Sequence, residues 1–202
     1  MATEYMLIAR EMGAGWKDDF ACTIPAESVD DMRTRLDRVT RDQLVSSTPV
    51  NAVAAVLSTA LAGTNNDLDY TAATKGVAGN SITIAYVNPG TETATESVSV
   101  TGTAISVTLR SVSSVLSTAT QVKTAIDAHA GASALVTVAN KSGNDGTGNV
   151  IALTATAMTG GVDGTTGRAG EARYDTSYLY VCVAAQTVAG TNWRRVSLGS
   201  AY

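Results

Sequence analysis

Residues 68–164 constrain the fold more than any other part of this 202-residue chain, because Thr, Ser, Val, Ala and Gly dominate the stretch. Apolar and polar residues alternate along it, as they do in strands that bury one face. Turn-forming residues such as Asn88-Pro89-Gly90 separate the alternating runs. Val and Thr favour strands, since branched side chains pack well on a pleated surface. We therefore predict a mainly β module.

One helix interrupts this module. Val122, Ile126 and His129 recur at helical spacing between residues 118 and 130, and Gly131 follows as a predicted C-terminal stop. The module is flanked by two shorter sections, so we divide the chain at residues 1–66, 67–164 and 165–202. Residues 50–62 are apolar and small, and we leave open whether they form a strand or a linker that packs along a neighbour.

The first section is predicted to be an α+β segment. Residues 5–10 have the composition of a strand. The charge-dense residues 27–42 place Met32, Leu36 and Val39 at helical spacing, which predicts a short amphipathic helix with a solvated charged face. The last section, residues 165–202, is predicted to form a small β-meander.

Half of the ten aromatic residues lie in the predicted meander, among them Tyr178, Tyr180 and Trp193. Aromatic side chains supply a large buried area at low entropic cost. These residues could therefore build a compact mini-core or an interface with another protein. A third alternative is an exposed aromatic platform that binds carbohydrate.

Charge and hydropathy exclude several classes of protein. The formal net charge is −4 and only 16% of residues are charged, which is a poor match to phosphate backbones. The longest apolar run, residues 52–57, is far shorter than the roughly 20 residues of a membrane helix. The first residues lack the basic start of a signal peptide. We expect a protein made in the cytoplasm that binds neither nucleic acid nor membrane.

The residues that usually carry catalysis are few and scattered. The single histidine, His129, is expected to cap a helix or lie on the surface. Cys22 and Cys182 are either two apolar core residues or one bridge that joins the ends of the chain. Asp145 lies in a Gly-rich loop that is expected to be a tight turn rather than a calcium site. We therefore expect no enzymatic activity, no cofactor and no metal ion.

Four motifs, in order, resemble a module that recurs in virion proteins of tailed bacteriophages. Residues 70–84 read YTAATKGVAGNSITI, and residues 99–109 read SVTGTAISVTL. Residues 122–126 then supply the helix sequence VKTAI, and residues 158–165 end the module with MTGGVDGT. The match covers about half of the chain. The resemblance implies an Ig-like β-sandwich for the middle domain.

The C-terminal section resembles a second pattern of phage surface, fibre and decoration proteins. Residues 170–184 read GEARYDTSYLYVCVA, and residues 193–198 read WRRVSL. Residues 1–66 resemble no pattern that can be named, and we expect them to carry the attachment that is specific to this protein.

These resemblances imply a non-enzymatic virion protein that decorates and cements a capsid. Such a protein would contact the major capsid protein and form a homotrimer at local three-fold positions. A tail, neck or fibre component is the alternative within the virion, and a carbohydrate-binding module is the alternative outside it. The candidate interface residues are Tyr5, Leu7, Met32, Arg35, Leu36, Val39, Tyr178, Tyr180 and Trp193.

Overall fold

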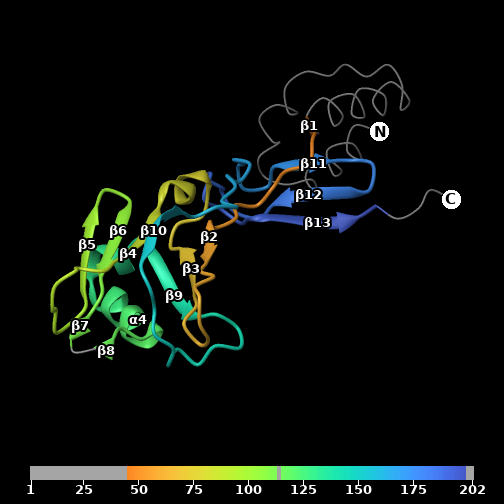
Figure 1. Cartoon of the computed structure of the whole chain (residues 1–202). Helices are drawn as coiled ribbons and strands as arrows, with labels where there is room; N and C mark the ends of the chain where they lie inside the picture. The colour runs from red at the N-terminus through yellow and green to blue at the C-terminus, as the bar shows by residue number, and fades with distance from the viewer. Residues whose placement is uncertain (1–44, 113–114, 199–202) are drawn as a thin grey trace, which may run out of the picture. The chain divides into compact units, whose positions relative to one another are not determined.

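The structure is a computed structural model, and it describes residues 45–112 and 115–198 (Figure 1). The chain divides into two compact units, residues 1–46 and residues 47–202. In the first unit only the short strand β1 (Val45–Ser46) is described. The predicted strand at residues 5–10 and the predicted helix at residues 27–42 lie outside the described residues.

The second unit is mainly β, as predicted, and its described residues form three small sheets, a short β-ribbon and two helices. Its helices are α4 (Ala119–Ala128) and α5 (Ala130–Ser133), and a 3-10 turn covers Val77–Ser81. Its strands are β2 (Val56–Ser58), β3 (Leu68–Ala72), β4 (Thr83–Val87), β5 (Ser97–Thr101), β6 (Ala104–Thr108), β7 (Ser111–Val112), β8 (Val115–Leu116), β9 (Val136–Asn140), β10 (Leu153–Ala157), β11 (Ala172–Tyr174), β12 (Tyr178–Cys182) and β13 (Trp193–Ser197).

The first sheet has the order β10-β4-β6-β5. The strands β5 and β6 form a hairpin, and Gly102 at its turn has a φ of +61°, a conformation that glycine adopts without a steric penalty. The strand β6 also pairs in parallel with β4, so it lies between β4 and β5. Alternation predicts that these strands exist, but it does not say which strands become neighbours. The parallel pair is therefore a finding of the structure.

The second sheet has the order β2-β3-β9, and α4 packs against β9 and β5. Along β3, Leu68, Tyr70 and Ala72 are buried while the residues between them are not, which confirms the predicted period of two. Val122 and Ile126 of α4 are fully buried against the same core. A buried side chain of this size contributes about 1.5–3 kcal/mol, so one shared core stabilises both sheets and the helix.

The helix α4 ends earlier than the sequence predicts. It begins with a capping box in which Thr118 and Gln121 satisfy each other's backbone N–H groups. At its other end His129 closes α4 and caps α5, because its Nδ1 accepts a hydrogen bond from the Ala132 N–H at 3.2 Å. Gly131 is therefore part of a second short helix rather than the predicted stop. The expectation that His129 caps a helix is confirmed.

The structure draws the boundary between the first two sections earlier than residue 66. The strand β2 pairs with β3, and Ala55 is completely buried in the core that the middle strands share. Val53 exchanges two backbone hydrogen bonds with Val162, at 2.9 and 3.1 Å. Pairing and burial thus hold residues 53–58 against the strands of the β module, and the second compact unit begins at residue 47.

The predicted C-terminal meander is confirmed as an antiparallel sheet of β11, β12 and β13. Asp175 makes the turn between β11 and β12, since its Oδ1 accepts from the N–H groups of Ser177 and Tyr178. The sheet has its own small cluster of buried residues, separate from the main core: Tyr180, Cys182 and Trp193, with Tyr178 packed against them.

Candidate functional site

The predicted interface residues that the structure describes gather in the C-terminal sheet. Tyr178 and Tyr180 lie on β12, and Trp193 begins β13. The other candidates lie outside the described residues: Tyr5, Leu7, Met32, Arg35, Leu36 and Val39.

The pairing register places the three aromatic side chains on one face of the sheet. Tyr180 is opposite Arg195, and Cys182 is opposite Trp193. Tyr180 and Trp193 are only 6% and 3% exposed, which is what the mini-core alternative predicts for them. The guanidinium of Arg195 lies 4.6 Å from the centre of the Tyr178 ring. These three rings therefore do not form the exposed platform that a carbohydrate-binding module needs.

Trp193 is held by a hydrogen bond and by a cation. Its Nε1 donates to the carbonyl oxygen of Thr165 at 2.8 Å, and Gln186 Nε2 donates to the same oxygen at 2.8 Å. The guanidinium of Arg173 lies 5.1 Å from the indole centre. A cation over an indole face is attracted by the negative face of the ring. The indole therefore connects β13 to Thr165 and to β11.

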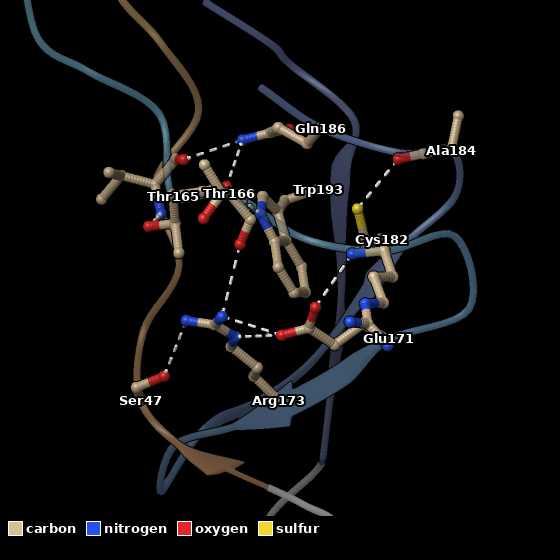
Figure 2. Close-up of polar contacts among 11 residues, drawn as sticks. Ser47, Thr165, Thr166, Glu171, Arg173, Cys182, Ala184, Gln186 and Trp193 are labelled. Atoms are coloured by element: carbon tan, nitrogen blue, oxygen red, sulfur yellow. Dashed lines mark hydrogen bonds and ion pairs between the residues drawn. The ribbon is translucent and has the colours of Figure 1, made fainter. Parts of the chain in front are cut away.

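Arg173 is the polar centre of this arrangement (Figure 2). Its Nε donates to Glu171 Oε1 at 2.8 Å, and one terminal nitrogen lies at the same distance from that oxygen. The other terminal nitrogen donates to Ser47 Oγ at 3.3 Å. The Arg168 N–H first, and then Arg173, hold the pKa of Glu171 below its usual range. A charge-assisted network of this kind ties residue 47 to the meander.

Asp175 is a second polar centre, at the turn between β11 and β12. Its Oδ2 accepts from the Tyr180 hydroxyl at 2.6 Å and from Thr48 Oγ1 at 3.2 Å. These bonds and the turn N–H groups, with the Tyr180 hydroxyl as the largest cause, lower the pKa of Asp175 from 3.8 to about 2. The same hydrogen bond raises the pKa of Tyr180.

The lowered pKa of Asp175 predicts that the free energy of unfolding decreases in acid. The folded pKa of Asp175 lies below its ordinary value, so ionised Asp175 stabilises the fold above about pH 4, and this contribution is lost as pH falls toward 2. In urea titrations across that range, we expect wild type to lose more stability than Asp175→Asn. The matched control is Asp127→Asn, an exposed carboxylate on α4. Parallel curves for wild type and Asp175→Asn would contradict the assignment.

A groove of about 610 Å³ opens beside β13. Its two sides are residues 48–51 and the strands β12 and β13. The lining residues are Thr48, Pro49, Val50, Asn51, Tyr180, Trp193, Arg194 and Arg195. The volume falls within the range of about 300–1,000 Å³ that is usual for ligand sites.

The other residues that the sequence singled out have structural roles. Asp145 Oδ1 accepts from the Thr147 N–H at 2.9 Å and from the Thr147 hydroxyl, which makes the predicted tight turn. Cys182 is a buried free thiol whose Sγ donates to the Ala184 carbonyl, while Cys22 lies outside the described residues. Within residues 45–112 and 115–198, no three His, Cys, Asp or Glu side chains cluster as metal ligands do.

Sequence reasoning did not find Asn51, Arg173, Asp175 or Arg195 as part of this site. The alternation of β12 already groups Tyr178, Tyr180 and Cys182, but only the strand register brings Arg173 and Arg195 beside Tyr180.

Across the described residues, no helix is long and apolar enough to cross a membrane. Comparison with protein-family models, with curated proteins and with solved structures finds no match.

Proposed function

We propose that this protein is a non-enzymatic structural protein of a tailed-phage virion that decorates and cements the capsid. The proposal combines the resemblance of the four ordered motifs with one structural observation. Large apolar side chains are exposed on chain segments that lie together, and such exposure is typical of surfaces that bind other proteins.

Five exposed valines lie on these segments, and we call them the valine cluster: Val53, Val56, Val77, Val162 and Val188, each 44–53% exposed. Backbone hydrogen bonds bring their segments together. Val53 pairs with Val162, and its carbonyl oxygen also accepts from the Gly76 N–H. The Gly164 N–H donates to the carbonyl oxygen of Val188. The cluster therefore draws on four segments that are far apart in the sequence.

A cement protein works by adding buried area across the seams between capsid subunits. The core of such an interface is apolar and poor in charge, and the rim is polar. The valine cluster has the character of such a core. The resemblance further supports contact with the major capsid protein and a homotrimer at local three-fold positions.

The proposal also includes a β-sandwich for the middle domain. The inner faces of β3 and β9 from one sheet and of β4 and β6 from the other contribute to one hydrophobic core. Packing of two sheets over a shared core is the arrangement of a sandwich. The helix α4 borders the same core.

Electron microscopy of the assembled particle tests the proposal. A cement protein is expected in many copies that follow the lattice of the head. A single ring at one vertex, or density confined to the tail, would favour the tail, neck or fibre alternative. A particle that does not contain this chain would overturn both.

A charge placed in the valine cluster should weaken binding to capsids. We expect Val53→Glu to lower the affinity for heads that lack this protein by more than about tenfold, because an unpaired carboxylate would be buried at the interface. The control is Val87→Glu, at a valine that is 44% exposed on β4. Co-sedimentation measures both variants. If the two variants lose affinity equally, the valine cluster is not part of the interface.

A further inference from the structure

The strand β13 has one edge that faces away from β12. Backbone bonds join Val183 to Asn192 and Leu198 to Ser177, which fixes the alternation of the β12–β13 ladder. In an antiparallel pair, every second residue directs its N–H and C=O away from the partner strand. Trp193 and Arg195 are two such residues, so their backbone groups point toward the groove.

Asn51 already pairs with the backbone of the first of these residues, Trp193, as a neighbouring strand would. Its side-chain amide donates to the Trp193 carbonyl oxygen and accepts from the Trp193 N–H, both at 3.1 Å. Arg195 is the next outward-facing position, and its backbone groups have no partner on this side among the described residues. Asn51 therefore satisfies the outward backbone groups of Trp193, and those of Arg195 remain unpaired on this side among the described residues.

The groove along this edge carries two cations, and the carboxylate of Asp175 contacts its lining through hydrogen bonds from Thr48 Oγ1 and the Tyr180 hydroxyl. Of its eight lining residues, Arg194 and Arg195 are charged and none is a carboxylate. Both arginines are exposed, although Arg194 also donates to the Thr191 carbonyl oxygen and Arg195 lies over Tyr178. The surface therefore combines an unpaired strand edge with two cations that can form ion pairs with carboxylates.

We propose that this groove binds an extended, acidic segment of a partner protein, which adds to the sheet as a strand beside β13. Its backbone pairs with the N–H and C=O of Arg195, and its carboxylates contact Arg194 and Arg195. Strand addition of this kind takes affinity from main-chain hydrogen bonds and specificity from alternate side chains.

A second copy of the same edge is a poorer occupant. Two β13 edges side by side would bring arginines close together, and charged residues on an edge strand oppose such self-pairing. An acidic segment instead neutralises both arginines. The edge therefore selects a partner of opposite charge.

The probe is a fluorescent peptide of about eight residues, a length usual for strands, with Glu at neighbouring central positions and Val elsewhere, because Arg194 and Arg195 are neighbours on β13 and point to opposite faces of the sheet. Fluorescence anisotropy with the full chain should show saturable binding that weakens with added salt. A peptide with Lys in place of Glu should not bind. We expect Arg194→Glu combined with Arg195→Glu to weaken binding by at least about tenfold. The matched control is Lys75→Glu, an exposed cation outside the groove, which should bind as wild type does.

A peptide whose outward amides are N-methylated separates strand addition from charge alone, because it keeps the carboxylates and loses the backbone donors. It should bind much more weakly than the unmodified peptide. Equal binding of the two peptides would overturn strand addition, and equal binding by the Lys peptide would overturn the role of the arginines. Self-association of the full chain that Arg195→Glu abolishes would instead assign the edge to a second copy. Circular dichroism verifies that each variant is folded.

Discussion

Trp193→Ala is expected to lower the free energy of unfolding by about 3–5 kcal/mol, the usual range for removing a buried aromatic side chain. The indole is 3% exposed and packs in the cluster with Tyr180 and Cys182. The substitution would also remove the hydrogen bond to the Thr165 carbonyl oxygen and the ring beneath the Arg173 guanidinium.

Urea unfolding followed by circular dichroism measures this loss. Trp193→Phe should cost less, because a ring remains for packing and the Thr165 carbonyl oxygen still accepts from Gln186. The control is Val196→Ala on the same strand, where the side chain is 63% exposed and the change should stay within about 0.5 kcal/mol. A loss below about 1 kcal/mol for Trp193→Ala would mean that the indole does not hold the meander in place.

Tyr86→Phe is expected to lower the free energy of unfolding by about 1–3 kcal/mol. The hydroxyl groups of Tyr70 and Tyr86 lie 2.5 Å apart in the main core, where the two residues are 0% and 2% exposed. Removal of one hydroxyl leaves the other buried with no partner, which costs its full desolvation. Burial, as the main cause, raises the pKa of both tyrosines, so the pair stays neutral at ordinary pH.

A double-mutant cycle isolates this pair. The variant that carries both Tyr70→Phe and Tyr86→Phe should lose less than the sum of the two single variants, because no unsatisfied hydroxyl remains. Tyr174→Phe, at an exposed tyrosine of β11, is the control and should leave the unfolding midpoint in urea unchanged. Additive losses in the double variant would show that the two hydroxyls do not depend on each other.

Two structural features of the site lay beyond sequence reasoning. Residues 50–62 read equally well as a strand or a linker, and only their pairing with β3 and residue 162 places them in the β module. Arg173 lies on β11 and Arg195 on β13, and only the pairing register of these strands with β12 places both arginines beside Tyr180. Local patterns do not encode such neighbours.

The sequence by itself determined the mainly β character, the start of α4 and the C-terminal meander. These properties depend on alternation, helical spacing and turn chemistry, which act between residues close in the chain. Only the tertiary structure decided the parallel pairing of β4 with β6, the unit boundary near residue 47 and the burial of Tyr180 and Trp193. These depend on contacts between distant segments, where many pairings satisfy the same local pattern and packing selects one.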